Sequence, residues 1–197
     1  MHDEPGPAIK ADGGSREIAQ TPALRPLGTV YLSAAHNLSG FTSRSTRIQG
    51  FIQNEVQEYL AKRYCSVCVW PHPDDPSRIL GFYTLAACSI EREELNNRFS
   101  RKNKTIGGIA VPMALVGYMG KSVDAPKGFG GTLILDAAIR AARSEDIPVW
   151  GLALHPENDS LAKWYGTLGF TVGEAWRIDN KRRRVMYAPL KALMPAE

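Results

Sequence analysis

The sequence predicts a single α/β domain, of α+β character, in which helices flank a mixed central sheet. Its 197 residues, 44% hydrophobic and 22% charged, have the balance of one globular domain. Segments with strand and helix patterns alternate along the chain. The segment Ile109–Lys121 is apolar almost throughout, as expected for a strand buried on both faces of a sheet.

Composition argues against membrane and secreted classes. The most apolar run, Ile109–Met119, contains Pro112 and is shorter than the ~20 residues of a membrane span. The first residues carry acids and lack the hydrophobic core of an export signal. Three cysteines cannot all pair within one chain, so a reducing, cytoplasmic setting is expected.

The N-terminal segment divides into an arm and the start of a domain. Residues 1–25 are rich in glycine, proline and mixed charge, which predicts a disordered arm, and the folded domain is expected over residues 26–197. A first strand is expected over Thr29–Ala34, followed by a turn at "NLSGF".

An amphipathic helix is expected next. Ser45 or Thr46 is a suitable N-cap. The apolar positions that follow recur at helical spacing, at Ile48, Ile52, Val56 and Leu60.

Two strand patterns around a Pro-Asp turn then predict a β-hairpin, over Cys65–Trp70 and Ile79–Ile90. Cys65, Cys68 and the nearby His72 also raise a redox or zinc interpretation. A redox pair should open a helix, and zinc needs four ligands, so strand or core cysteines without a metal are expected. Polar, basic residues 91–108 predict a short helix and a loop.

The second half continues the alternation. A glycine-rich loop precedes a helix over Phe129–Arg143, and a strand is expected over Ile147–Leu154. A further helix begins at Asn158 or Asp159 and ends at Gly169. The last two strands are expected at "GEAWRI" and "RRVMYAPL", joined by "DNKR".

The glycine loop "KGFGG" allows two interpretations. It can be an ordinary loop, because glycine adopts backbone angles that other residues avoid. It can also bind an anion, because the first N–H groups of a helix are unpaired and its dipole is positive there. Gly128, Gly130 and Gly131 place no side chain over those groups, and Lys127 adds a positive charge.

Two stretches resemble the GCN5-related N-acetyltransferase (GNAT) family. The loop is similar to the family pattern Gln/Arg-x-x-Gly-x-Gly/Ala at Gly128 and Gly130, but its first position falls on Ala125. The stretch "HPENDSLAKWYGTLGF" is similar to the family's asparagine-led helix with a tyrosine, at Asn158 and Tyr165, and a terminal Leu-Gly-Phe. The resemblance implies a GNAT-type domain with a splayed cofactor-binding strand.

A narrower resemblance lies upstream. "ILGFYTLAACSIEREEL" is similar to a strand of the acetyltransferase toxins of type II toxin–antitoxin modules. This resemblance implies transfer of acetyl from acetyl-CoA to the amino group of aminoacyl-tRNA. It further implies a ribbon-helix-helix antitoxin as a partner and leaves a homodimer open. The alternatives are acetylation of a small-molecule or protein amine, and a degenerate domain that only binds nucleic acid or a partner, which Ala125 keeps open.

The resemblance also implies roles for individual residues. Tyr165 would protonate the departing thiolate, and a backbone N–H, that of Met119, would stabilise the oxyanion. Gly117 and Gly120 in the preceding strand fit a bulge or a close backbone approach. His155 or Glu157 could relay a proton. The expected cofactor-binding residues are Met119, Lys121, Lys127, Gly128, Phe129, Gly130, Gly131 and Asn158, with no metal.

Basic residues are clustered in the sequence, which suggests either a nucleic-acid face or solvated surface charge. One pair is Arg44 and Arg47, and the other clusters are expected to form a tRNA face. These are Arg98, Arg101, Lys102 and Lys104 in the loop, and Lys181, Arg182, Arg183 and Arg184 near the end of the last hairpin.

Overall fold

The computed structural model describes residues 28–91, 94–95, 110–178 and 181–194, with only the backbone for 174–178 and 181–184. A seven-stranded mixed sheet forms its centre, in the order β1-β2-β3-β4-β5-β7-β6. Only β4 and β5 pair in parallel; the other neighbours are antiparallel. The strands are β1 (Val30–Tyr31), β2 (Ser66–Pro71), β3 (Ile79–Glu91), β4 (Ala110–Lys121), β5 (Gly151–Leu154), β6 (Thr171–Ile178) and β7 (Lys181–Pro189).

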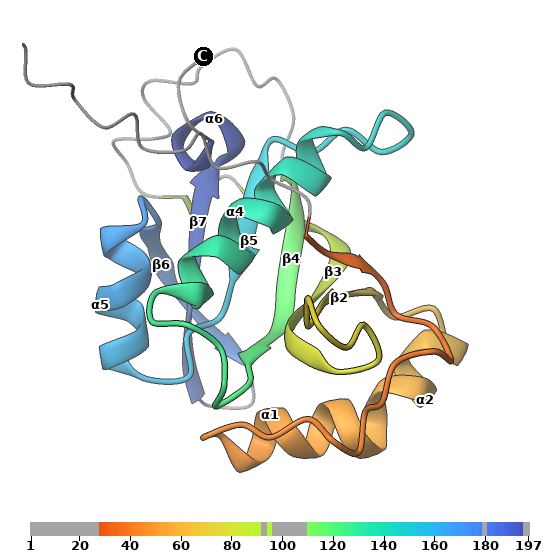
Figure 1. Cartoon of the computed structure of the whole chain (residues 1–197). Coiled ribbons are helices and arrows are strands. Elements are labelled where there is room, and N and C mark those ends of the chain that lie inside the picture. The colour runs from red at the N-terminus through yellow and green to blue at the C-terminus, as the bar shows by residue number, and fades with distance from the viewer. Residues whose placement is uncertain (1–27, 92–93, 96–109, 179–180, 195–197) are drawn as a thin grey trace, which may run out of the picture.

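Helices cover both faces of this sheet. Figure 1 shows the long helix α4 lying across the sheet, with α5 beside β6 and the N-terminal helices at one end. The elements are α1 (Thr46–Gly50), a π-helical turn η1 (Phe51–Glu55), α2 (Val56–Ala61), α4 (Phe129–Ala142), α5 (Asp159–Thr167) and α6 (Leu190–Leu193). None of the helices in the described part of the chain is long and apolar enough to cross a bilayer.

Alternation along the strands separates two apolar layers. In β2, Cys68 packs in the cluster under α4, whereas Val67 and Val69 pack with Phe51 and Ile52 of the N-terminal helices. Strand β4 is buried on both faces, as its composition predicted: Ala114 and Val116 lie in the α4 cluster, and Val111 and Met113 in a third cluster.

Several expected elements are confirmed and two are shorter than expected. The hairpin of β2 and β3 forms around Cys68↔Tyr83, and α4 and α5 occur where the glycine loop and Asn158 predicted them. The first strand covers only Val30–Tyr31. The strand expected from Ile147 begins at Gly151, because Pro148 has no N–H to give to a ladder.

The N-terminal helix differs from a regular α-helix. Ser45 caps it as expected, its side chain accepting from the N–H of Ile48. The π-turn at Phe51–Glu55 then interrupts it. The apolar positions repeat every four residues, which drifts around an α-helix of 3.6 residues per turn. A wider turn corrects this drift, and Phe51, Ile52 and Val56 are all buried.

A buried polar network fixes α4 to the sheet and to the segment before β1. The Asp136 carboxylate, 1% exposed, accepts hydrogen bonds from the Tyr83 hydroxyl at 2.5 Å and from the Thr29 hydroxyl. Both hydroxyls in turn accept from Arg140, at 3.1 Å from Nε to Tyr83 and 3.0 Å to Thr29. The Arg140 guanidinium also donates to the Thr29 carbonyl at 2.7 Å. The Tyr83 and Thr29 hydroxyls therefore link the positive charge of Arg140 to the negative charge of Asp136.

Replacing Asp136 with Ala is expected to lower the free energy of unfolding by roughly 3 kcal/mol. The Tyr83 and Thr29 hydroxyls would lose their acceptor, and Arg140 would lose its compensating charge. Urea denaturation followed by circular dichroism measures the change. The matched control is Asp146→Ala, at an exposed site after α4, for which a change within about 0.5 kcal/mol is expected. Equal effects of the two substitutions would contradict a stabilising role of the network.

Candidate functional site

The parting of β4 from β5 opens the sheet. Their parallel pairing runs from Met113↔Gly151 to Val116↔Leu154 and then ends. Strand β4 continues along β3 to Gly81↔Lys121. Beyond Val116, the edge of β4 that faced β5 is therefore not covered by a strand. The splayed strand implied by the sequence resemblance is present.

Two glycines shape the open part of β4. The register shifts between Tyr83 and Leu85, so Gly117 and Tyr118 together oppose Thr84 in a bulge, and the Tyr118 N–H donates to the Thr84 hydroxyl at 2.9 Å. A Cβ at Gly120 would lie 2.2 Å from Cγ2 of Ile48 in α1. The expected bulge and close approach are thus both confirmed, one at each glycine.

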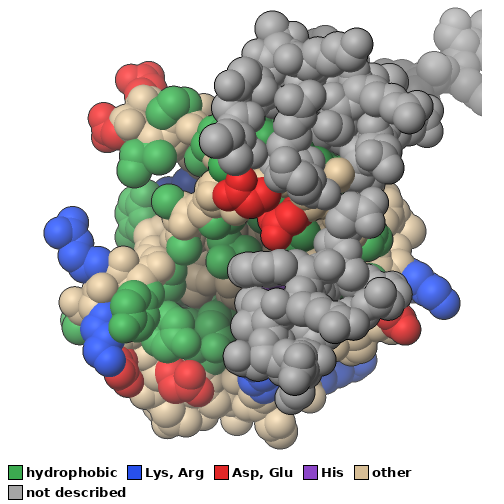
Figure 2. All heavy atoms as spheres, turned by 180° about the vertical axis from the view of Figure 1, so that it is seen from behind, with side chains coloured by type: hydrophobic (Ala, Val, Ile, Leu, Met, Phe, Trp, Pro, Cys, Tyr) green, Lys and Arg blue, Asp and Glu red, His purple; other side chains and the backbone are tan. Residues whose placement is uncertain are grey.

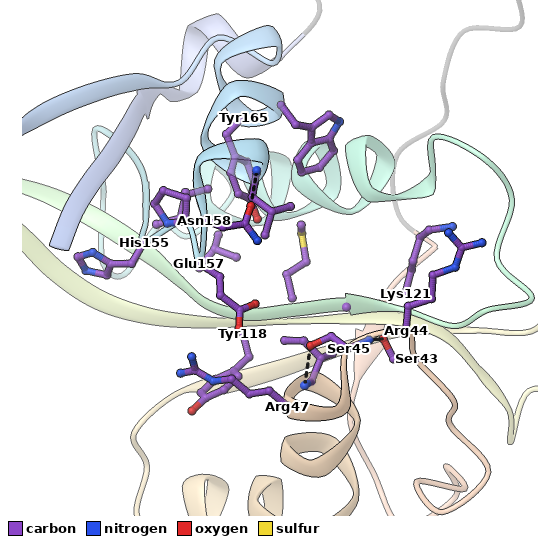
Figure 3. A pocket seen from close by; sticks show the side chains of 18 of the residues that line it. Ser43, Arg44, Ser45, Arg47, Tyr118, Lys121, His155, Glu157, Asn158 and Tyr165 are labelled. Atoms are coloured by element: carbon purple, nitrogen blue, oxygen red, sulfur yellow. Dashed lines mark hydrogen bonds between the residues drawn. The ribbon is translucent and has the colours of Figure 1, made fainter.

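A cavity of about 910 Å³ lies in the opening between β4 and β5. This volume is within the range of cofactor and small-molecule sites. Figure 3 shows α1 on one side of it, β4 along its length and α5 on the other side. The lining residues from these elements include Arg44, Arg47 and Ile48, then Val116–Val123, Leu154–Asp159, and finally Leu161, Ala162, Trp164 and Tyr165.

The Tyr165 ring is buried and its hydroxyl faces the cavity. The side chain is 8% exposed, and its ring contacts Trp164 and Phe170 at centroid distances of 4.8 and 5.6 Å. Figure 3 shows the hydroxyl directed into the cavity. Burial raises the pKa of Tyr165 to about 12. The phenol therefore keeps its proton throughout the neutral range, and the residue both anchors α5 and presents a donor.

The loop from β5 to α5 brings three further polar residues to the cavity. His155, Glu157 and Asn158 all line it, and Figure 3 shows Glu157 reaching toward Tyr118 and Arg47 on the opposite wall. Asn158 is the N-cap of α5, and its side-chain oxygen accepts from the Leu161 N–H at 2.9 Å. The amide NH₂ of Asn158 is then available to a ligand.

The glycine turn forms at the N-terminus of α4, and only part of its backbone is free. Gly128 has φ +83°, which requires glycine or a residue tolerant of the left-handed region. Phe129 donates its N–H to the Pro126 carbonyl at 3.2 Å, and Gly131 donates to the Gly128 carbonyl at 2.9 Å. Within the described chain, the N–H groups of Gly128 and Gly130 have no such partner.

The side chains around the turn limit which of the predicted cofactor-binding groups are accessible. Phe129 is buried and contacts Trp70, so only its backbone faces the loop. A Cβ at Gly130 would lie 3.1 Å from Cη2 of Trp164, which lines the cavity. Gly130 therefore permits α4 and α5 to pack closely as well as leaving its N–H accessible. Lys127 is exposed, and neither it nor Gly128–Gly131 is among the residues that line the cavity.

The residues proposed for a tRNA face fall largely outside the described structure. Arg98, Arg101, Lys102 and Lys104 lie outside the described residues. Lys181–Arg184 belong to β7 itself and not to a connecting loop; they pair with β6 beyond the end of the β5 pairing. On the face opposite to Figure 1, the visible lysine and arginine side chains are scattered at the rim (Figure 2).

Sequence reasoning missed two groups at the site. Tyr118 forms part of the floor, its ring stacked 3.7 Å from Phe51 and beneath the Arg47 guanidinium. The Tyr118 side chain is half-buried against α1 and η1. Arg44 was noted only as a basic residue, although it lines the same cavity as Lys121.

Comparison with known proteins identifies the fold of this chain. No protein-family model and no curated protein matches the sequence. Several solved structures match with probability 1.00, and three of them each cover 84% of this chain. One is AtaT complexed with acetyl-methionyl-tRNAfMet, at 20% identity, 95% coverage of that chain and a TM-score of 0.71. Another is a Tyr-to-Phe mutant of KacT, at 18% identity, 95% coverage of that chain and a TM-score of 0.69. The third is AtaTR bound with AcCoA, at 20% identity, 94% coverage of that chain and a TM-score of 0.64.

At sequence identities of 18–20%, the similarity to these structures concerns the fold alone. The chain has the single-domain α/β fold of these toxin structures, with its mixed sheet and flanking helices. The GNAT-type fold predicted from the two motif stretches is therefore confirmed.

Replacing Gly120 with Ala is expected to destabilise the protein by about 1–3 kcal/mol, because the new Cβ would overlap Ile48 and push α1 away from β4. The double variant Gly120→Ala/Ile48→Ala removes the clashing methyl and should recover part of the loss. Thermal unfolding measures both. The control Gly50→Ala, whose Cβ would meet nothing within 4 Å, should not destabilise. Additive effects of the two substitutions would show that the contact does not set the width of the cavity.

Proposed function

We propose that the protein is an acetyl-CoA-dependent N-acetyltransferase that acetylates the amino group of aminoacyl-tRNA and thereby acts as a toxin. The observation that carries the proposal is one cavity that combines the open edge of β4 with the Tyr165 hydroxyl and extends to Val123, in the segment between β4 and the glycine turn of α4. The fold agrees with this proposal, since AtaT was solved with acetyl-methionyl-tRNAfMet and AtaTR with AcCoA.

The uncovered edge of β4 suits the arm of acetyl-CoA. Pantetheine carries amide groups that can pair with a strand edge as an added strand does. Beyond Val116 the backbone of β4 offers such an edge, and Met119 and Lys121 lie on it. The N–H groups of Gly128 and Gly130 would then receive the diphosphate at the positive end of α4.

Acetyl transfer needs a neutral amine, a polarised carbonyl and a stabilised thiolate. The amine nitrogen forms the new bond to the acetyl carbon while the C–S bond breaks, and the proton lost by the amine passes to solvent. His155 and Glu157, at the mouth of the cavity, are positioned to accept it. An α-amino group has a pKa near 8, so a strong base is unnecessary. The Met119 N–H is the proposed oxyanion donor.

Tyr165 is the proposed donor to the departing sulfur. A free thiol has a pKa near 8.5, below the value of about 12 for Tyr165. Full proton transfer to a relaxed thiolate is therefore uphill in the empty site. The hydroxyl instead stabilises the negative charge that develops on sulfur by donating a hydrogen bond, and the thiolate takes up a proton from solvent after the C–S bond has broken.

The partners and the location belong to the same proposal. AtaT was solved with the C-terminus of its antitoxin AtaR and acetyl-CoA, and KacTA with DNA. By analogy we expect a ribbon-helix-helix antitoxin for this chain, a cytoplasmic location and a homodimer. We also propose that residues 26–197 form the catalytic domain and that residues 1–25 are a disordered arm.

Incubation with radiolabelled acetyl-CoA tests the function. Purified protein is mixed with charged tRNA, uncharged tRNA, a protein extract and small amines. Label on charged tRNA alone is the expected result. Label on small amines or proteins alone would favour the general acetyltransferase, and absence of both binding and transfer would favour a degenerate binding domain.

Tyr165→Phe removes one hydroxyl and keeps the ring between Trp164 and Phe170. The melting temperature and acetyl-CoA affinity should stay nearly unchanged, while turnover falls by on the order of 10²–10⁴-fold. Steady-state kinetics and calorimetry measure these quantities. The control Tyr64→Phe changes a tyrosine that is 59% exposed and should keep full turnover. Full turnover of the Tyr165 variant would leave the residue with a packing role only.

Replacing Arg182 and Arg183 with Ala tests the proposed RNA face on β7. Acetylation of charged tRNA should weaken most at low salt, and the salt slope should fall by about 0.7–0.9 per lost phosphate contact. Acetylation of a small amine should not change, because the cavity residues are intact. Equal loss on both substrates with a lowered melting temperature would assign these arginines to the sheet.

A further inference from the structure

The position of Ala125 leaves the diphosphate site without a side-chain donor. In the family pattern this position holds Gln or Arg, whereas Ala125 is buried, with 8% of its surface exposed. Its N–H donates to the Ser122 carbonyl at 3.1 Å, and its carbonyl accepts from Lys121. The loop therefore offers an anion only the backbone of the glycine turn and Lys127.

Lys121 places a positive charge against this loop. Its Nζ lies 3.2 Å from the Ala125 carbonyl and 3.3 Å from the Pro126 carbonyl. These two bonds hold the ammonium beside the residues that lead directly into the turn at Gly128. An ammonium has three donors, so one remains for a ligand.

A backbone hydrogen bond holds the segment that carries Arg44 against the end of β4. The Val123 N–H donates to the Thr42 carbonyl at 3.0 Å, which joins the segment before α1 to the end of β4. Both Arg44 and Lys121 line the cavity, and Figure 3 shows their side chains together at the same end of it. Arg47 and Glu157 lie away from this end, toward Tyr118.

The charge of this pair is not neutralised by acidic side chains. Among the described residues, neither Arg44 nor Lys121 has a carboxylate within ion-pair distance, whereas nearby Arg78 is paired with Asp124 at 3.1 Å. Two like charges at one end of a cavity repel each other, and an anion bound between them relieves that repulsion.

We propose that Arg44 and Lys121 form the side-chain anchor for the diphosphate of coenzyme A and replace the donor that Ala125 lacks. This inference rests on the proposed function. The diphosphate lies between the N–H groups of the glycine turn on one side and the two positive side chains on the other. An arginine from the segment before α1 thus takes over a task that the family pattern assigns to the loop.

A phosphate of bound RNA is the competing ligand for the same charges. The geometry favours the diphosphate, because the Lys121 ammonium is bonded to the loop that starts the α4 turn. The amine-side residues His155 and Glu157 belong to a different part of the cavity lining, on the β5–α5 loop.

The test compares two acetyl donors that differ in the diphosphate. Arg44→Ala is assayed with acetyl-CoA and with S-acetylpantetheine, which has the thioester arm but no diphosphate, using a small amine or charged tRNA as acceptor. We expect the KM for acetyl-CoA to rise about 10- to 100-fold, the range for losing a hydrogen bond to a charged group. The KM for S-acetylpantetheine should not change, and Arg44→Lys should recover part of the affinity.

The control is Arg143→Ala, which removes the same charge at the other end of α4, about 20 Å from the glycine turn. It should leave both KM values unchanged. Equal losses of Arg44→Ala on both donors would overturn the proposal and assign Arg44 to the shape of the cavity. A loss confined to the KM for charged tRNA would overturn it in favour of an RNA phosphate. Failure of the unaltered protein to bind acetyl-CoA would instead overturn the proposed function itself.

Discussion

The site depends on the early end of the pairing between β4 and β5. After Val116↔Leu154 the two strands separate, while β4 remains bonded to β3 as far as Lys121. A backbone edge inside a sheet is normally satisfied by its neighbour. Here it borders a cavity instead, so a ligand with amide groups can complete it. The bulge at Gly117 and Tyr118 and the contact of Gly120 with Ile48 shape this opening.

The helix that carries the glycine turn is fixed by a second constraint. Tyr83 of β3 bonds to Asp136 and accepts from Arg140, both on α4, and it also opposes Met119 in the sheet. One residue therefore relates the helix to the strand proposed to supply the oxyanion donor. Packing alone would allow α4 to slide along the apolar face, because dispersion forces have little directional preference. The hydrogen-bonded network removes that freedom.

The cavity separates two kinds of chemistry. At one end, Arg44 and Lys121 concentrate positive charge near the α4 turn. At the other, His155 and Glu157 offer groups that can accept a proton, with the Tyr165 hydroxyl reaching in from α5. An acetyl donor bound along β4 would place its anionic part at the first end and its thioester toward the second. Proximity and orientation of this kind can supply a large part of the rate enhancement of a transfer reaction.

The sequence by itself determined the order of the elements and their capping, because these depend on neighbouring residues. Ser45, Asn158 and Gly169 act where local rules place them: two as N-caps, and Gly169 at φ +97° after α5. The motif stretches also indicated the GNAT-type fold. The early end of the β4–β5 pairing and the placement of Arg44 and Lys121 along one cavity were decided by tertiary structure. Contacts between segments distant in the sequence shape this site: Ile48 lies over Gly120, Thr42 lies beside Val123, and Tyr83 bonds to Asp136. Such contacts depend on how complete elements pack, which no local pattern of residues encodes.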